Sequence, residues 1–183
     1  MDKTIQLHDL HFTPYIQEQD IMDKVQEMAQ KLGDKYAGKN PLFLGVLNGA
    51  FIFTADLVRA CEFNCEISFI KLSSYSGTSS TNNLATLIGL SEPVEGRHVV
   101  IVEDIIDSGQ TLNKFIPELL ELGPASVEVA ALLVKPEAME YKVDIHYKGF
   151  DIPPAFVVGY GLDYDGLGRN LRDIYQLKIV GSD

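Results

Sequence analysis

The sequence predicts an α/β fold in which a mostly parallel, twisted sheet is flanked by helices. Short apolar runs alternate along the chain with segments whose apolar residues recur at helical spacing. Several of these runs are apolar throughout, which is typical of parallel strands covered by helices on both faces. The length of 183 residues fits a single domain that spans residues 1–183.

The first predicted elements follow an N-terminal segment that carries His8 and His11, which we expect to be a frayed arm. A helix is expected from Asp20, because apolar residues recur there at helical spacing, and Gly33 and Gly38 are its stop signals. The apolar positions of this helix are Ile21, Val25, Met28 and Leu32.

A strand, a tight turn and a second helix come next. Pro41 precedes the apolar run 42–47, Asn48-Gly49 forms the turn, and helical spacing resumes at Phe51. The other predicted strands cover residues 65–72, 99–102, 127–134 and 156–162, with 174–180 as an edge strand.

A third helix follows residue 109 and contains Pro117, so we expect a kink or a break there. Its apolar positions are Leu112, Phe115, Ile116 and Leu119.

The charge balance restricts the classes of partner. With 15 Lys and Arg against 26 Asp and Glu, the net charge is −11, and no basic cluster occurs along the sequence. Such a chain repels DNA, RNA and anionic membranes, but it can bind a small anion through a divalent cation. Without a signal peptide or a long apolar run, a cytoplasmic location is expected. Cys61 and Cys65 imply neither a disulfide nor a zinc site.

Polar residues follow four predicted strands. They are Asn48-Gly49, Glu103-Asp104, Lys135 and Asp163. In parallel sheets, ligands bind at the carboxyl ends of the strands, so these residues mark the expected site.

The segment 99–111, VVIVEDIIDSGQT, is the richest in candidate functional residues. Its acidic pair requires hydrogen-bond donors or a metal, and Asp107 to Thr111 has the composition of a loop that opens a helix. Consecutive N–H groups in such a loop can bind a phosphate. The same residues also fit an ordinary capped turn with Asp107 or Ser108 as N-cap, and local physics leaves both interpretations open.

Three other ligand-binding motifs are absent or incomplete. The sequence has no P-loop, and Gly166-Leu-Gly168 lacks the third glycine of a dinucleotide fingerprint. Asp163-Tyr-Asp165-Gly166 begins like a calcium loop but has its glycine too early and no closing Glu.

The segment 99–111 resembles the phosphoribosyl pyrophosphate (PRPP) signature of the type I phosphoribosyltransferases at every position. Four further blocks, 47–57, 68–78, 132–137 and 156–164, resemble the purine branch of that family in the same order. The resemblance covers about residues 40–175. It implies the type I fold with a small hood formed from the termini, and a flexible lid loop at about 73–86.

The resemblance implies Mg²⁺-dependent transfer of phosphoribosyl from PRPP to a 6-oxopurine, hypoxanthine or guanine. The products would be a purine nucleoside monophosphate and pyrophosphate, and the assembly a homo-oligomer, a dimer or tetramer. A regulator that keeps the fold without the chemistry is the alternative. A receiver domain is excluded because only 79 residues follow Asp104.

The resemblance also assigns roles to residues. The 5′-phosphate would bind the backbone of Asp107, Ser108, Gly109, Gln110 and Thr111. The ribose and Mg²⁺ would face Glu103 and Asp104. Lys135 would bind the 6-oxo group, Phe156 would stack on the purine, and Val157 would read its 2-position through the backbone. Asp163 would bind a second Mg²⁺ beside Arg169, and Ser74 and Tyr75 would belong to the lid.

Asp107 is the candidate general base, because a buried carboxylate with a raised pKa could accept the purine proton. The Leu47-Asn48 bond would be the family's cis peptide, next to Gly49. Asn48 stands where many family members have Lys or Arg, so backbone amides, Arg169 and Mg²⁺ would bind the pyrophosphate.

Overall fold

The computed structural model describes residues 4–73, 85–88, 90 and 92–178 and contains two sheets. The larger sheet has the strand order β5-β4-β3-β6-β7-β8, and all its neighbours are parallel except β4 and β5. Its strands are β3 (Leu42–Val46), β4 (Glu66–Ser73), β5 (Ala85–Ile88), β6 (His98–Ile106), β7 (Ser126–Val134) and β8 (Tyr147–Asp151). The predicted parallel sheet is therefore confirmed.

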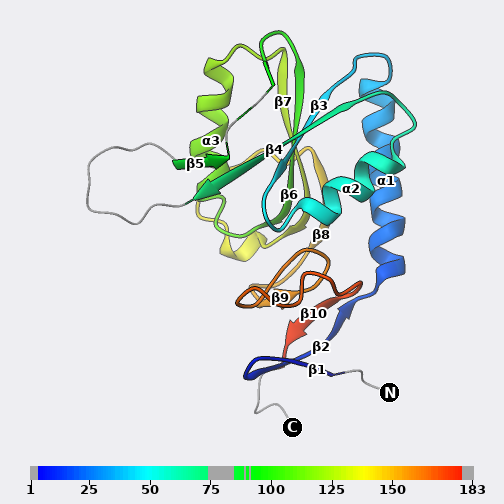
Figure 1. Ribbon diagram of the computed structural model, residues 1–183, viewed down its shortest axis with the longest axis vertical. Coiled ribbons are helices and arrows are strands. Elements are labelled where there is room, and N and C mark those ends of the chain that lie inside the picture. Colours follow the sequence, from blue (N-terminus) through cyan, green and yellow to red (C-terminus); the bar gives the residue numbers. More distant parts are fainter. Residues whose placement is uncertain (1–3, 74–84, 89, 91, 179–183) are drawn as a thin grey trace.

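Helices cover both faces of this sheet (Figure 1). The helices α1 (Glu18–Tyr36) and α2 (Phe51–Ala60) share one buried cluster with Val100 and Val102 of β6. The helix α3 (Gln110–Glu121) shares the other cluster with Val99 and Ile101, so alternate residues of β6 serve the two faces. A short 3₁₀ helix, η1 (Pro136–Ala138), follows β7.

The second sheet is the hood, formed by segments near the two ends of the chain (Figure 1). Its strand order is β1-β2-β10-β9, and every described pairing in it is antiparallel. The strands are β1 (Ile5–Leu7), β2 (Leu10–Ile16), β9 (Val157–Val158) and β10 (Ile174–Leu177).

Two predictions about the hood were wrong. His8 and His11 do not lie in a frayed arm, because β1 and β2 pair as a hairpin that packs on β10. The strand expected at 174–180 is not an edge strand, because β10 lies between β2 and β9. The apolar residues Phe12, Val158 and Tyr175 form a buried cluster there and hold these strands together.

Other boundaries also differ from the sequence-based expectation. The strand expected at 156–162 is reduced to β9, because Gly159 and Gly161 adopt φ values of +101° that end the extended chain. Gly33 does not stop α1, which continues to Tyr36. Pro117 lies inside α3, which shows no break there.

A buried polar cluster lies near the amino ends of β7 and β8, opposite the predicted site. Glu128, which is 6% exposed, accepts hydrogen bonds from Tyr36 (2.6 Å) and Tyr147 (2.8 Å) and pairs with Lys35. Burial would raise the pKa of Glu128, but these donors outweigh it and hold the pKa below its ordinary value. The cluster thus fastens the end of α1 to the sheet.

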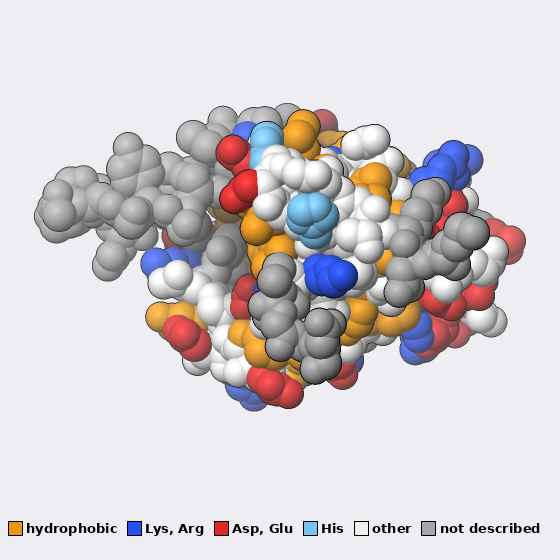
Figure 2. All heavy atoms as spheres, turned by 90° about the horizontal axis from the view of Figure 1, so that it is seen from below, with side chains coloured by type: hydrophobic (Ala, Val, Ile, Leu, Met, Phe, Trp, Pro, Cys, Tyr) orange, Lys and Arg blue, Asp and Glu red, His pale blue; other side chains and the backbone are white. Residues whose placement is uncertain are grey.

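Figure 2 shows the hood end of the molecule, where acidic and basic side chains are mixed around the rim. Among the described helices, none is both long and apolar enough to cross a membrane.

Candidate active site

A cavity of about 370 Å³ lies where the carboxyl ends of β3, β6 and β7 meet the hood. The cavity therefore brings together most of the polar residues predicted from the strand ends. Its lining residues are Asn48, Gly49, Asp104, Ile105, Asp107, Lys135, Phe156, Val157, Leu162, Asp163 and Arg169.

The acidic pair lies within β6 rather than after it, because the strand continues to Ile106. Consecutive strand residues point to opposite faces, so the two carboxylates serve different cavities. Asp104 lines the main cavity, while Glu103 lines an adjoining one of about 120 Å³ together with residues 105–112. A side chain at Gly49 would overlap the carboxylate of Asp104, so glycine there lets Asp104 keep its position against the turn after β3.

Both carboxylates of the pair lie where ionisation is unfavourable. Burial, with the charge of Asp104 adding to it, raises the pKa of Glu103 well above its ordinary value. Burial raises the pKa of Asp104 to about 6, although local backbone hydrogen bonds and Arg169 oppose the shift. Glu103 Oε2 is buried and has no hydrogen-bond partner among the described residues. A polar or cationic ligand would supply the missing partner.

The loop before α3 has the geometry of an anion-binding turn. Gly109 occupies the N-cap position in the left-handed region, with φ +79°, and has no side chain to cap the helix. Ser108 Oγ accepts from Gln110 N, the first amide of α3, at 3.3 Å, but the N-cap residue is Gly109 and not Asp107 or Ser108, as the alternative interpretation required. The first amides of α3 thus stand at the mouth of the smaller cavity, where the helix dipole favours an anion.

A second segment fixes the shape of this loop. The amides of Glu140 and Tyr141 both donate to the Ser108 carbonyl oxygen, at 3.0 Å each. A Cβ atom on Gly109 would lie 2.7 Å from the Tyr141 carbonyl oxygen, so this contact also requires glycine. The connection between β7 and β8 therefore supports the loop from outside.

Lys135 and Asp107 form an ion pair across the main cavity, with Nζ 2.7 Å from Oδ2. The Lys135 side chain is only 11% exposed, whereas that of Asp107 is 57% exposed. The expectation of a buried Asp107 was wrong, because the residue stands after β6 ends, at the opening of the loop. A substrate group that hydrogen-bonds to Lys135 therefore also lies close to the carboxylate of Asp107.

Phe156 forms an aromatic wall beside Lys135 in the cavity lining. Its ring is backed by Phe12, with centroids 6.0 Å apart, and by Tyr164, with centroids 5.8 Å apart and an edge-on arrangement. Phe156 remains 43% exposed, so its free face can stack on a flat ring. Val157 pairs with β10, and its side chain is buried and apolar. Only the backbone of Val157 can therefore offer hydrogen-bonding groups to a ligand in the cavity.

Asp163 and Arg169 form the remaining side of the cavity. Asp163 Oδ1 lies 2.7 Å from Arg169 Nη2, and Asp163 Oδ2 accepts from Gly166 N at 2.7 Å. Asp163 was expected after a strand of the parallel sheet, but it follows the hood strand β9 instead. The site is thus built by both sheets.

Two apolar lining residues, Ile105 and Leu162, were missed by sequence reasoning. Nothing in their local pattern separates them from core residues. The peptide bond Leu47-Asn48 is cis, as the family resemblance implied. Ser74 and Tyr75, assigned to the lid, lie outside the described residues.

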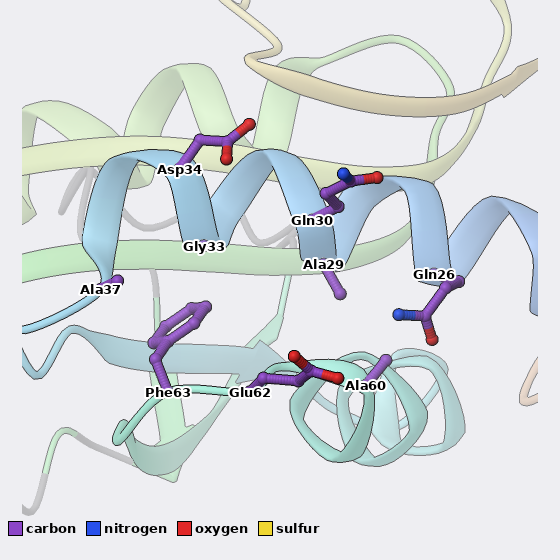
Figure 3. A pocket seen from close by; sticks show the side chains of 9 residues that line it. All are labelled: Gln26, Ala29, Gln30, Gly33, Asp34, Ala37, Ala60, Glu62 and Phe63. Atoms are coloured by element: carbon purple, nitrogen blue, oxygen red, sulfur yellow. The ribbon is translucent and has the colours of Figure 1, made fainter.

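A separate hollow of about 380 Å³ lies between α1 and the segment that follows α2 (Figure 3). Ala29 of α1 and Phe63 point into the space between these segments, whereas Asp34 points away from it. Because its nine lining residues include no Lys or Arg, this hollow does not suit an anionic substrate.

A loop with the geometry of an anion-binding turn, which follows a central parallel strand with an acidic pair inside it, is typical of the phosphoribosyltransferase class. The family model for the phosphoribosyl transferase domain matches residues 14–165. The chain is 42% identical over 164 residues to a hypoxanthine-guanine phosphoribosyltransferase of Lactococcus lactis, covering 89% of each chain. It is 40% identical over 179 residues to a hypoxanthine-guanine-xanthine phosphoribosyltransferase of Tritrichomonas foetus, covering 97% of each.

Solved structures agree with these relatives. A hypoxanthine phosphoribosyltransferase from Staphylococcus aureus superposes with a TM-score of 0.85 at 36% identity, and the match covers 90% of each chain. The chain belongs to the phosphoribosyltransferase family, in its hypoxanthine-guanine branch.

Proposed function

We propose that this protein transfers the 5-phosphoribosyl group from PRPP to a 6-oxopurine, hypoxanthine or guanine, and releases pyrophosphate. The observation that carries the proposal is the position of Lys135. Its buried side chain lines the same cavity as the half-exposed ring of Phe156, and its ammonium group is paired with Asp107, the first residue of the proposed phosphate loop. A base bound there lies next to a bound sugar phosphate.

The purine end of the cavity favours a 6-oxo group. A lysine donates hydrogen bonds and cannot accept them, so Lys135 suits a carbonyl oxygen and disfavours the amino group of adenine. Phe156 supplies stacking, and the backbone of Val157 supplies contacts to the 2-position. These groups do not rank hypoxanthine, guanine and xanthine.

The phosphate end is the loop from Asp107 to Thr111, through Ser108, Gly109 and Gln110. Its amides at the start of α3 would hold the 5′-phosphate of PRPP. On the other side of β6, the backbone near Asn48 and Gly49, together with Arg169, would bind the pyrophosphate. Asn48 is uncharged, so the cationic side chains of the cavity lining are Lys135, assigned to the purine, and Arg169, which is left for the pyrophosphate.

We include Mg²⁺ as the cofactor, which Asp104 and Asp163 would hold in the main cavity together with substrate oxygens. Asp104 fits the ion, because its carboxylate is buried and a cation would offset the cost of its charge. Glu103, whose Oε2 lacks a described partner, lines the adjoining cavity and would not share that ion. Among the described residues, no group of three acidic, His or Cys side chains could hold a metal alone. A site with so few protein ligands is typical of Mg²⁺, which proteins usually bind through one or two carboxylates together with phosphate oxygens of the substrate. When bound there, Mg²⁺ would supply positive charge that offsets the charge of the leaving pyrophosphate.

The reaction forms a bond between a purine nitrogen and C1 of the ribose and breaks the bond from C1 to pyrophosphate. Positive charge develops on the sugar, and the carboxylate of Asp104, which lines the main cavity, would stabilise it. The purine nitrogen loses its proton to Asp107, which acts as general base beside Lys135. The exposed position of Asp107 means that bound substrates, together with the lid segment 73–86 that carries Ser74 and Tyr75, must exclude water.

The test is a spectrophotometric assay with PRPP, Mg²⁺ and one of four bases: hypoxanthine, guanine, xanthine or adenine. We expect nucleotide from hypoxanthine or guanine, none from adenine, and loss of activity when EDTA removes Mg²⁺. Failure to form nucleotide from any base would favour a regulator that binds PRPP without chemistry.

We also propose that the chain forms a homo-oligomer, a dimer or tetramer. Large apolar side chains remain exposed on α2, on β4 and at the end of α3, and since α2 and α3 cover opposite faces of the larger sheet, they would serve separate contacts between subunits. These side chains are Phe51, Ile67, Leu120 and Leu122. Light scattering that reports a monomer at micromolar concentration would contradict this proposal.

A further inference from the structure

Tyr160 has an unusual backbone conformation beside the site. It is a non-glycine residue at φ +49°, between Gly159 and Gly161, which both adopt φ +101°. Bulky residues avoid this left-handed region unless their surroundings hold them there. Its amide donates to the Leu171 carbonyl oxygen at 2.8 Å, and its side chain is only 4% exposed.

The phenol of Tyr160 connects the hood to the parallel-sheet layer. Its hydroxyl donates to Asp56 Oδ2 at 2.8 Å, and Asp56 lies in α2. Burial, helped by the hydrogen bond to Asp56, raises the pKa of Tyr160, so the phenol stays protonated and keeps donating. The helix α2 begins directly after the turn that carries Asn48 and Gly49.

Gly161, the residue after Tyr160, contacts both groups that are proposed to bind pyrophosphate, Arg169 and the turn at Gly49. Gly161 accepts from Arg169 Nη1 at 2.7 Å through its carbonyl oxygen and donates to the Arg169 carbonyl oxygen at 3.0 Å. A side chain on Gly161 would overlap the Gly49 carbonyl oxygen, so these backbones are in direct contact. Arg169 in turn holds Asp163.

We propose that Tyr160 and Asp56 are positioning residues for pyrophosphate. Their hydrogen bond fixes Gly161 against the Gly49 turn, and Gly161 orients the guanidinium of Arg169. Neither residue lines the cavity, so both act through these groups rather than on substrate. This inference rests on the proposed function, because it assigns a role toward the leaving group of that reaction.

The test compares Tyr160→Phe with Tyr147→Phe. Each substitution removes one hydroxyl from a buried tyrosine that donates to a carboxylate at 2.8 Å, but Tyr147 belongs to the Glu128 cluster at the opposite end of the sheet. Calorimetry measures pyrophosphate binding in the presence of Mg²⁺, and steady-state kinetics measures KM for PRPP and for the purine. Thermal unfolding measures the stability of each variant.

For Tyr160→Phe we expect pyrophosphate affinity to fall and KM for PRPP to rise by about tenfold, with KM for the purine within about twofold of wild type. Tyr147→Phe is expected to lower the melting temperature without changing pyrophosphate affinity. Asp56→Ala should match Tyr160→Phe, while Asp56→Asn, which keeps an oxygen acceptor, should restore wild-type binding.

Equal pyrophosphate affinities in Tyr160→Phe and Tyr147→Phe would overturn the inference, as would equal effects of Asp56→Ala and Asp56→Asn. If Tyr160→Phe does not fold, the Asp56 pair decides the question alone. Wild-type protein that binds no pyrophosphate would instead overturn the proposed function, so the two failures are distinguishable.

Discussion

Asp104 is a proposed Mg²⁺ ligand, and its burial also destabilises the free protein. It lies within β6 and lines the main cavity, where burial raises its pKa to about 6 from an ordinary value of 3.8. A group whose pKa is raised on folding destabilises the folded state once it is ionised. The penalty is absent below the ordinary pKa and complete above the raised one.

We therefore predict that Asp104→Asn stabilises the free protein in a pH-dependent way. Its gain in unfolding free energy should be near zero at pH 3.5 and rise to about 3 kcal/mol by pH 7, from a shift of about two pKa units. Urea denaturation at pH 3.5, 5, 6 and 7 measures this gain. A gain that does not vary with pH would contradict the prediction. The same variant should lose most of its transferase activity.

Asp107 is predicted to act in proton transfer rather than in PRPP binding. For Asp107→Asn we expect turnover to fall by roughly 10²- to 10⁴-fold, because general-base catalysis contributes about that much. PRPP affinity, measured by calorimetry, should change little, since the loop is proposed to bind phosphate through its backbone amides, which the substitution keeps.

The control is Asp151→Asn, which removes another half-exposed carboxylate that pairs with a lysine at 2.7 Å, here Lys148. Turnover should be unchanged in this control. Unchanged turnover in Asp107→Asn would exclude that residue as the base.

At the scale of elements, the phosphate loop depends on a neighbouring segment for its shape. Ser108 accepts two amide hydrogen bonds from the β7–β8 connection, and Gly109 fits closely against the same connection. Lys135 begins that connection, so the purine end and the phosphate end share one structural support. A distortion of either segment should therefore affect both substrates.

We predict that Gly109→Ala raises KM for PRPP by roughly tenfold or more, because a 1.4 kcal/mol distortion already corresponds to tenfold. The added methyl would be strained at φ +79° and would meet Tyr141. Gly96→Ala is the matched control: Gly96 has φ +68° but nothing within 4 Å of its Cβ position. It should lower stability and leave KM for PRPP unchanged. Similar kinetics in both variants would contradict this prediction.

Most elements of the parallel sheet were predictable because their strands are continuous apolar runs, as in Leu42–Val46 and Ser126–Val134. The strands β5 and β8 were missed. Their sequences, ATLI and YKGFD, are short or mixed in polarity, so local periodicity does not reveal them. The hood strands were misplaced because their pairing joins segments from opposite ends of the chain. Tertiary contacts of this kind leave no local signal.

The site was predictable where motif and strand end coincide, as at Asp107 and Lys135, which the structure brings within 2.7 Å. The separation of Glu103 from Asp104 was not foreseen, because the apolar run at 99–102 gave no sign that β6 continues to Ile106. The Tyr160–Asp56 contact also has no sequence signal, since it depends on how the hood packs on α2.

At the scale of the whole molecule, the two sheets share one of the three buried clusters. The largest buried cluster contains Ile16 and Ile174 of the hood together with Phe43 and Leu132 of the parallel sheet. A shared core of this kind couples the stability of the two parts. It supports the proposal that residues 1–183 form a single domain.

We predict that thermal unfolding is a single transition. Far-ultraviolet circular dichroism and tyrosine fluorescence should give the same midpoint, because tyrosines lie in both sheets, as Tyr147 and Tyr175 do. Adding PRPP with Mg²⁺ should raise that midpoint in both signals equally. Two separate midpoints would show that the hood and the parallel sheet unfold independently.

The pairing of β2 with β10 also affects synthesis of the protein. Ile16 pairs with Ile174, so the first of these strands leaves the ribosome long before its partner exists. The strands of the parallel sheet, β3 to β8, are all translated before β10. A nascent chain can therefore assemble the phosphate end of the site early, whereas the wall that carries Phe156 is completed only near the end of translation.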